Sequence, residues 1–227
     1  ERAIQLRIKN KWRYYIFIDE IQHIKDFEVA ISSIRVSFNC SLFVTGSNSK
    51  LLYGKMQERL TGRAKEFEIY PFTYSEVLKY KQENHIEISK NEFDDYLKYG
   101  GMPQRFLETS EDDIRKYLVS LYQSIVKKDV YGTHKRINKT LFGNISKYLI
   151  NSTGHTFSSL SIAKYFKNDL PKDDQKKFSE TINNYARYLV ESYLLMECYP
   201  FYLKGKEALK GTKKYYAMKI ISKKSFK

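Results

Sequence analysis

The sequence predicts an α/β fold: a parallel β-sheet at the start of the chain, then a mostly α-helical region with a winged helix-turn-helix. Three observations predict it. Apolar runs over 14–18 and 41–45 flank an apolar-periodic segment over 27–38, which is the strand, helix, strand order of a parallel sheet. After Pro71, which cannot continue a central strand, the apolar period becomes helical. Near the end of the chain, two segments with helical periodicity precede two segments in which apolar and polar residues alternate, as they do in strands.

The bulk composition is that of a globular protein. The 227 residues suffice for one large domain or two small ones, and 42% are hydrophobic. No apolar run approaches the roughly 18–20 residues of a membrane span. The two cysteines, Cys40 and Cys198, lie far apart, and the four histidines show no metal-ligand spacing. We therefore expect a cytoplasmic protein with no disulfide framework, no cysteine-based zinc site and no membrane contact.

The net charge of +14 is unevenly distributed. Residues 1–113 carry 17 Lys and Arg against 18 Asp and Glu, whereas residues 114–227 carry 23 against 8. This asymmetry predicts two modules, the second facing a polyanion such as DNA. An ordinary lysine-rich surface is the alternative. The uneven charge and the change to helical periodicity after Pro71 together suggest three regions. They are part of an α/β core over 1–72, a helical linker or lid over 73–113, and a basic helical and winged-helix module over 114–227.

The first region continues beyond its two strand runs. A helix over 49–60 leads through Thr61, Gly62 and Arg63 into a short strand over 66–69. The later regions contain apolar residues at three- and four-residue spacing, which predicts helices. These helices are expected near 75–82, 91–98, 103–108 and 111–130.

The basic region ends in a sequence of elements typical of a winged helix-turn-helix. A short helix over 158–166 is followed by a polar turn over 171–177. Ser179 then caps a second helix that reaches about residue 191. Two strands over 193–199 and 213–218, with a turn at 204–206 between them, complete the order.

Two adjacent carboxylates follow the first strand run. Asp19 and Glu20 stand where open α/β sheets bind their ligands, at the carboxyl end of a strand. Phosphoryl-transfer enzymes use one aspartate to hold Mg²⁺ and a second carboxylate to orient the attacking water. A buried strand that ends in an acidic loop is the alternative.

Two further elements suit the same chemistry. The polar run Thr45–Asn48 ends the neighbouring strand, where a hydroxyl or amide can bind a γ-phosphate or the attacking water. Arg59 and Arg63 flank the turn at Gly62, and an arginine beside a strand end stabilises charge on a transferring phosphoryl group. A helix C-terminus carrying cations and ended by glycine explains the arginines equally well.

Five motifs, in this order, resemble the prokaryotic AAA+ superfamily of P-loop ATPases, whose nucleotide-binding core precedes a helical and winged-helix module. They are the segments 16–22, 43–52, 60–63, 70–76 and 99–103. The resemblance implies ATP and Mg²⁺ as cofactors, Asp19 as the Walker B magnesium ligand and Glu20 as the water-activating base. It further implies Ser47 or Asn48 as the sensor-1 residue and Arg63, with Arg59 second, as the arginine finger.

The chain also departs from that family. No Gly-x-x-x-x-Gly-Lys-[Ser/Thr] occurs in it, so the loop that cradles phosphate is absent from the sequence. In the family this loop precedes the Walker B strand, and members continue into a region similar to a restriction-endonuclease core. We therefore expect a fragment truncated at both ends, and we expect this chain alone to bind ATP weakly or not at all.

Functions of different classes follow from these patterns. The leading one is an AAA+ type ATPase that acts as a nucleotide-dependent switch on DNA or a protein partner, with an oligomer possible. The alternative is a non-catalytic DNA-binding regulator with a vestigial ATPase core, whose helix over 179–191 enters the major groove. A protein-interaction module of a toxin–antitoxin or mobile-element locus is a third. The nucleic-acid candidates are Asn183, Asn184, Arg187, Lys204, Lys206, Lys213 and Lys214.

Overall fold

The computed structural model describes residues 4, 7, 12–46, 64–166, 172–201 and 213–218. The chain forms two compact units, Glu1–Glu68 and Ile69–Lys227. Among the described residues, no helix is long and apolar enough to cross a membrane.

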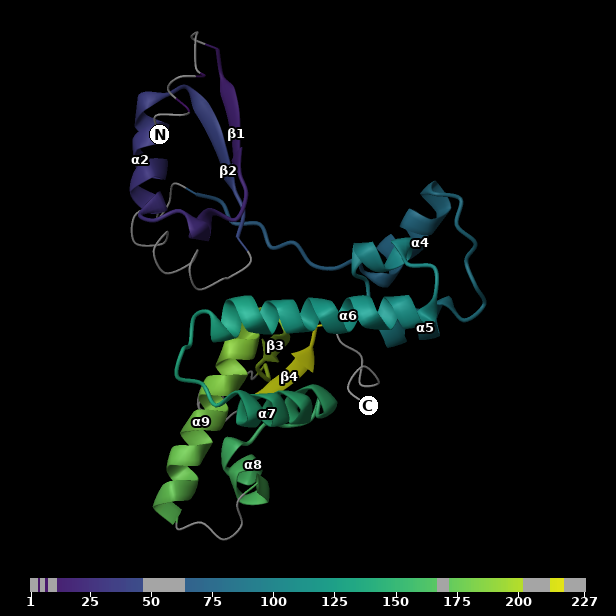
Figure 1. The fold of residues 1–227 in the computed structure, drawn as a ribbon. Coiled ribbons are helices and arrows are strands. Elements are labelled where there is room, and N and C mark those ends of the chain that lie inside the picture. Colours follow the sequence, from purple (N-terminus) through teal and green to yellow (C-terminus); the bar gives the residue numbers. More distant parts are fainter. Residues whose placement is uncertain are drawn as a thin grey trace. The chain divides into compact units, whose positions relative to one another are not determined.

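The first unit contains a two-stranded parallel sheet covered on one face by a helix (Figure 1). Strand β1 (Tyr14–Ile18) pairs with β2 (Cys40–Val44), with Tyr14 opposite Cys40 and Ile18 opposite Val44. The connection between them runs through η1 (Ile21–His23) and α2 (Phe27–Ser37). The strand, helix, strand order predicted from the sequence is confirmed.

A small apolar core joins α2 to the sheet. Ile21, Phe27 and Ile31 are buried, and they pack against side chains of β1 and β2 such as Ile18 and Leu42. The opposite face of the sheet carries Phe17, which is 74% exposed, and Phe43, which is 47% exposed, with 4.9 Å between their ring centroids. Strand β1 is therefore buried on one face only, because α2 covers a single face of the sheet among the described residues.

Two further expectations for the first unit have different outcomes. The helix expected over 49–60 lies outside the described residues. The strand expected over 66–69 is wrong, because residues 64–70 form extended chain outside any strand. Phe67 and Ile69 are exposed there, and no strand within the described ranges pairs with this segment. High β-propensity does not by itself make a strand, because a strand also needs a paired neighbour.

The second unit begins with helices close to those predicted. They are α4 (Tyr74–Glu83), α5 (Glu92–Tyr99), η2 (Pro103–Leu107) and α6 (Glu111–Ile125). Thr73 begins α4 in a capping box with Glu76, and the Ser110 side chain accepts a hydrogen bond from the Asp113 amide to begin α6. The mostly helical character predicted after Pro71 is confirmed.

The helix predicted over 111–130 is formed by α6 and the turn that continues it, whereas the helix after them was not predicted. Helix α6 runs directly into η3 (Val126–Tyr131), a π-helical turn. Helix α7 (Lys139–Asn151) follows, and the side chain of Asn138 caps it by accepting a hydrogen bond from the Leu141 amide at 3.0 Å.

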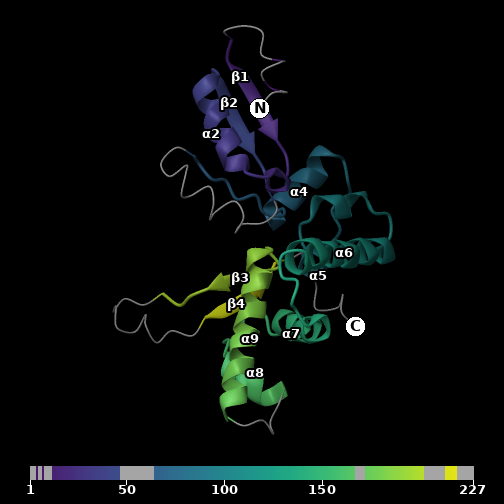
Figure 2. The same cartoon turned by 60° about the vertical axis from the view of Figure 1, so that its left-hand side comes forward.

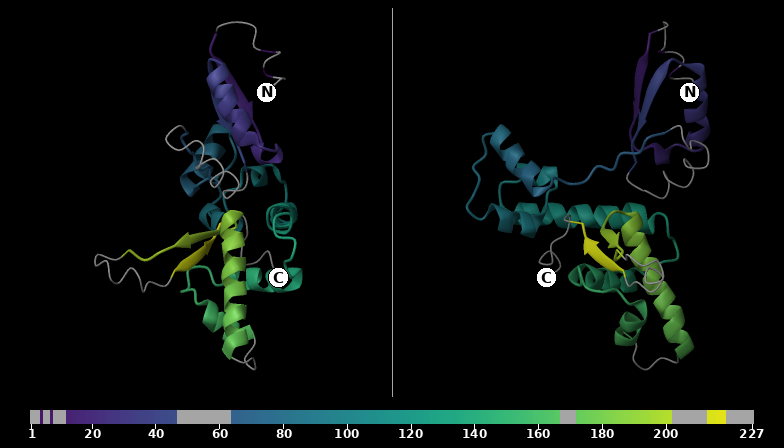
Figure 3. Two further views of the ribbon diagram at one scale, coloured as in Figure 1. Left: turned by 90° about the vertical axis from the view of Figure 1, so that its left-hand side faces the viewer. Right: turned by 180° about the vertical axis from the view of Figure 1, so that it is seen from behind.

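The chain then forms a long helix with a short helix and a β-hairpin beside it (Figures 2 and 3). These elements are α8 (Ser159–Phe166), α9 (Lys172–Glu191), β3 (Leu195–Cys198) and β4 (Lys214–Ala217). Strands β3 and β4 are antiparallel, as the alternating pattern predicts.

The start of α9 corrects two expectations. The predicted polar turn over 171–177 and the predicted cap at Ser179 are wrong, because α9 is helical from Lys172. Ser179 is buried inside the helix, and its hydroxyl donates to the Ser159 hydroxyl at 2.8 Å. The lysines and glutamine of this segment are good helix formers, so propensity outweighs polarity here.

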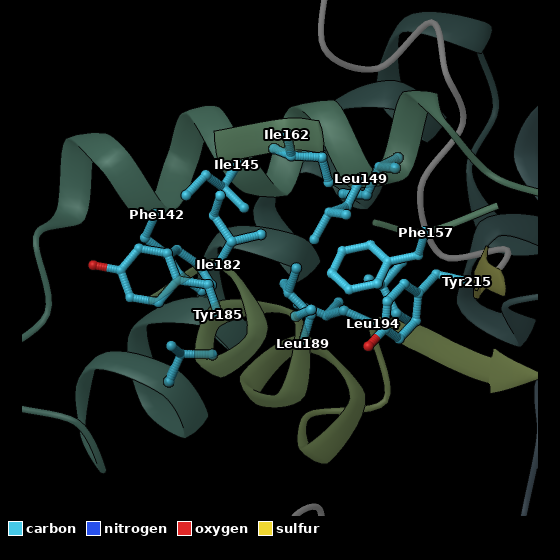
Figure 4. Packing of buried hydrophobic residues seen from close by; sticks show 14 of the residues in the cluster. Phe142, Ile145, Leu149, Phe157, Ile162, Ile182, Tyr185, Leu189, Leu194 and Tyr215 are labelled. Carbon is cyan, nitrogen blue, oxygen red and sulfur yellow. The ribbon is translucent and has the colours of Figure 1, made fainter. Parts of the chain in front are cut away.

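The core of the second unit lies where α7, α8, α9 and the hairpin meet (Figure 4). Phe142, Ile145, Ile182 and Leu189 have no exposed surface. Phe142 packs edge-on against Tyr185, with 5.3 Å between the ring centroids. This cluster fixes α9 against α7, and it therefore fixes the polar face of α9.

We predict that Phe142→Ala lowers the free energy of unfolding of the second unit by about 3–5 kcal/mol, because it removes a fully buried ring and leaves a cavity. The measurement is chemical denaturation followed by circular dichroism. The control is Leu160→Ala, because Leu160 is 55% exposed, and its expected loss is below about 1 kcal/mol. Equal losses for the two variants would contradict this view of the core.

Candidate functional site

The parallel pairing brings the carboxyl ends of β1 and β2 side by side. The Thr45 amide donates to the Ile18 carbonyl at 3.0 Å, and the Ile21 amide donates to the Thr45 carbonyl at 3.0 Å. These two bonds continue the sheet past its last paired residues. They hold the acidic pair Asp19 and Glu20 beside Thr45.

The hydroxyl of Thr45 links the two carboxylate-bearing residues. It donates to Oδ1 of Asp19, and it accepts a hydrogen bond from the Glu20 amide at 3.2 Å. One side chain therefore orients the Asp19 carboxylate and fixes the turn that carries Glu20. The sequence places Thr45 in a polar run at the strand end, but nothing in the pattern singles it out from Ser47 or Asn48.

The turn at Glu20 has an unusual backbone. Its φ of 50° and ψ of 50° lie in the left-handed region, which a non-glycine residue seldom adopts. Such a conformation costs about 1 kcal/mol or more, and residues of this kind cluster at active sites and ligand clamps. The side chains of Asp19 and Glu20 are exposed, so a ligand can reach both.

Magnesium would find one carboxylate and one hydroxyl at this edge. Oxygen ligands suit Mg²⁺, which takes one or two protein carboxylates and completes its shell with water and substrate phosphate. No cluster of three or more His, Cys, Asp or Glu occurs in the described part of the chain. Asp19 and Thr45 therefore fit a metal that arrives with a phosphate better than a metal held by protein ligands alone.

Several predicted site residues lie outside the described residues. These are Ser47, Asn48, Arg59, Arg63, Lys204 and Lys206.

Three of the nucleic-acid candidates share the exposed face of α9. Asn183, Asn184 and Arg187 are all exposed, and the Arg187 guanidinium donates to Oδ1 of Asn184 at 3.1 Å. Nε of Arg187 also lies 3.9 Å from Oε1 of Glu191. The fold brings these three residues together, although Glu191 offsets part of the arginine charge.

The two lysines at the start of β4 differ. Lys214 is exposed, whereas Nζ of Lys213 lies 2.6 Å from Oε1 of Glu197 and packs over the rings of Phe157 and Tyr215. Burial opposes the Lys213 charge, but hydrogen bonds to Glu197 and Tyr215 outweigh burial and raise the lysine pKa. Burial likewise opposes the Glu197 charge, and Lys213 outweighs it and lowers the pKa of Glu197. Lys213 is thus held in an ion pair with Glu197 of β3.

Two family models match the chain, and each covers a different part of it. Residues 1–78, which contain β1, α2, β2, Asp19, Glu20 and Thr45, match an AAA domain. Residues 90–219 match a domain of unknown function, DUF8612. The chain belongs to the DUF8612 family. The ends of β1 and β2 therefore lie in the segment that matches an AAA domain, the family that the sequence motifs resemble.

The DUF8612 chain is also similar to two curated proteins. One is an "Uncharacterized protein" of Haemophilus influenzae, 27% identical over 206 residues, which are 90% of this chain and 50% of the relative. The other is "Uncharacterized protein MJ1544" of Methanocaldococcus jannaschii, 32% identical over 202 residues, which are 85% of this chain and 44% of the relative. The chain spans about half the length of these relatives. No solved structure matches it.

We predict that Glu197→Gln lowers the free energy of unfolding by about 1 kcal/mol at pH 7, because it removes the charge that Lys213 binds. The folded-state pKa of Glu197 is lowered, so its contribution is present above its ordinary pKa of 4.5 and is lost as pH falls through the folded value. The variant should flatten the dependence of unfolding on pH below about 5.

The measurement is urea denaturation across a pH series from neutral to acid. The matched control is Glu83→Gln, because Glu83 pairs with Lys79 at 3.8 Å while 63% of its side chain is exposed. We expect less than about 0.5 kcal/mol from that surface pair. An unchanged acid dependence in Glu197→Gln would show that the Lys213 pair does not stabilise the hairpin.

Proposed function

We propose that the protein hydrolyses ATP with the strand ends of its AAA domain. One observation carries the proposal: a single hydroxyl, that of Thr45, joins the Asp19 carboxylate to the Glu20 turn at the carboxyl edge of a parallel sheet. This edge is where open α/β sheets bind their ligands, and the segment matches an AAA domain. The left-handed backbone at Glu20 and the hydrogen bond from its amide to Thr45 hold this turn against the neighbouring strand end.

Each residue of this edge takes a distinct role in the proposal. Asp19 would hold Mg²⁺, which would supply charge neutralisation at the phosphates when bound. Glu20 orients and activates the attacking water. Ser47 or Asn48 binds the γ-phosphate as sensor 1, and Arg63, with Arg59 second, neutralises charge on the transferring group. The nucleotide state would then move the helical region over 73–113 and the basic module over 114–227 against DNA or a protein partner.

The assay belongs on the complete gene product, because the chain spans about half of its curated relatives. The sequence holds no Gly-x-x-x-x-Gly-Lys-[Ser/Thr]. Without such a loop the triphosphate lacks most of its backbone amide donors and its lysine. The 227-residue chain by itself is accordingly expected to bind ATP weakly.

We predict that Glu20→Gln lowers ATP turnover by about 10²–10⁴-fold with little change in ATP affinity, because the amide cannot accept a proton from water. Thr45→Val should also lower turnover, because it releases the Asp19 carboxylate. Thr45→Ser keeps the hydroxyl and should stay near the wild-type rate. The measurements are phosphate release and equilibrium binding of a fluorescent ATP analogue.

The matched control for these variants is Arg35→Gln, which changes an exposed charged residue of the same unit near the end of α2, where the chain enters the opposite end of β2. Wild-type turnover in Glu20→Gln would remove Glu20 from catalysis. Equal rates in Thr45→Val and Thr45→Ser would show that the hydroxyl does not position the site.

A second candidate function is DNA binding through the basic module. The order of elements supports it, since α7, α8 and α9 precede the β3–β4 hairpin, and an isolated antiparallel bridge joins Thr156 to Lys214. A third short strand pairing with the hairpin, ahead of two helices, is the order of a winged helix. In this proposal α9 enters the major groove with Asn183, Asn184 and Arg187, while Lys204, Lys206, Lys213 and Lys214 contact phosphate.

For this candidate we predict that affinity for duplex DNA falls steeply as salt rises, with a logarithmic slope of about −0.9 per phosphate contact. Lys214→Ala should reduce the magnitude of that slope by about 0.9, the share of one phosphate contact. The control is Lys79→Ala on α4, an exposed residue that should leave the slope unchanged. Filter binding across a salt series measures the DNA affinity, and an affinity that does not change with salt would exclude phosphate contacts.

A further inference from the structure

The turn between η3 and α7 lies against α9 and encloses a cavity with it. The cavity has a volume of about 350 Å³. Its lining comes from residues 134–137, here called the basic turn, and from α9, which contributes Thr181, Asn184 and Tyr188. These three positions are three or four residues apart, so they lie on one face of the helix. The cavity therefore joins two segments that are distant in sequence.

A hydrogen bond and a ring stack fix the basic turn. The Ile137 amide donates to the His134 carbonyl at 3.3 Å. This bond closes a turn whose two central residues are Lys135 and Arg136. The His134 ring stacks on Tyr188 of α9, with 3.5 Å between the ring centroids. Both cations are therefore carried by a backbone that is already anchored to α9.

The cavity is positively charged. Lys135 and Arg136 are exposed, and no ion pair between described residues includes either of them. None of the described residues that line the cavity is acidic. Glu191 lies outside the lining, and its carboxylate is 3.9 Å from Nε of Arg187 and 4.0 Å from Nε2 of His134. The charge of the cavity therefore suits an anion.

Asn184 supplies a hydrogen-bond donor to the same cavity. Its Oδ1 accepts a hydrogen bond from the Arg187 guanidinium at 3.1 Å. The Nδ2 amino group of Asn184 remains to donate to a ligand. The Thr181 hydroxyl, by contrast, already donates to the Lys177 carbonyl at 3.2 Å. Two cations and an amide donor are groups that bind phosphate oxygens.

The basic turn and the β3–β4 hairpin flank α9. Figure 2 and the left view of Figure 3 show the hairpin on one side of α9 and α7, which the basic turn precedes, on the other. Lys214 is exposed on the hairpin. A duplex that receives a helix in its major groove has a phosphate backbone along each side of that helix. The hairpin thus lies toward one backbone and the basic turn toward the other.

We propose that the cavity binds a backbone phosphate of duplex DNA. Lys135 and Arg136 neutralise the phosphate, and the Asn184 amide donates to one of its oxygens. This contact rests on the proposed binding of DNA by the basic module, and it gives Asn184 the role of positioning the backbone and not of reading a base. Together with the phosphate beside Lys214, on the other strand, it fixes the position of α9 across the groove.

A nucleic acid suits this surface better than an acidic peptide. Residues 114–227 carry 23 Lys and Arg against 8 Asp and Glu, an excess that matches a polymer with one charge per phosphate. The cations of the basic turn and of the hairpin lie on two sides of α9, as the two backbones of a duplex do. A single peptide strand would follow one side only.

Salt-dependent binding of the full chain to duplex DNA tests the proposal. Lys135→Ala and Arg136→Ala should each reduce the magnitude of the logarithmic salt slope by about 0.9, and the double variant by about 1.8. Arg136→Lys keeps the charge and should keep most of the slope. The matched control is Lys90→Ala, which removes an exposed lysine ahead of α5 and should leave the slope unchanged.

Variants of Asn184 separate a phosphate contact from a base contact. Asn184→Ala removes an uncharged donor, so it should lower affinity about tenfold and leave the salt slope unchanged. Asn184→Asp keeps an oxygen for Arg187 but replaces the donor by a negative charge, so it should lower affinity further. Each loss should be equal for duplexes of different sequence, because a phosphate carries no sequence information. A loss that depends on the sequence of the duplex would overturn this role of Asn184.

Circular dichroism establishes that each variant is folded. Binding of DNA with an unchanged salt slope by the folded double variant, Lys135→Ala with Arg136→Ala, would overturn this phosphate site and leave the proposed DNA binding intact. A wild-type chain that binds no duplex DNA at low salt would overturn both. Release of bound DNA by poly-L-glutamate at an equal concentration of charge would assign the surface to an acidic protein instead.

Discussion

The parallel pairing of β1 with β2 is the constraint on which the site depends. Because both strands run the same way, their carboxyl ends meet at one edge, and the Thr45 hydroxyl can contact Asp19 and the Glu20 amide together. An antiparallel pair would place these groups at opposite ends of the sheet. Helix α2 makes the pairing possible, since a parallel connection must cross over one face, and it buries Ile31 and Phe27 there.

The second unit depends on a different physical effect, the burial of apolar side chains around α9. Phe142, Ile182 and Leu189 have no exposed surface, and they join α7 to α9 in one cluster. That cluster leaves the polar face of α9, which carries Asn184 and Arg187, on the surface. The AAA match and the DUF8612 match correspond largely to the two compact units, each with an apolar core of its own.

Sequence patterns succeeded where local signals and packing agree. The two parallel strands, the helices after Pro71 and the final hairpin all have the period of the face they bury. The patterns failed at two places, the first for lack of a strand partner and the second because helix propensity outweighs polarity. Residues 66–69 have strand composition without a described strand partner, and the lysine-rich segment before Ser179 joins α9 instead of forming a turn. Helix α7 was not predicted, although Asn138 caps it and Phe142, Ile145 and Leu149 repeat at helical spacing.

By itself, the sequence determined the chemistry available to this protein: adjacent carboxylates after an apolar run, a polar run after the next, and an excess of positive charge in residues 114–227. Residue type alone sets charge and ligand class. Only the tertiary structure decided which groups meet. It placed the Thr45 hydroxyl against Asp19 and Glu20, and it held Lys213 in a pair with Glu197. These contacts join residues far apart in sequence, and their geometry follows from packing, which no local pattern records.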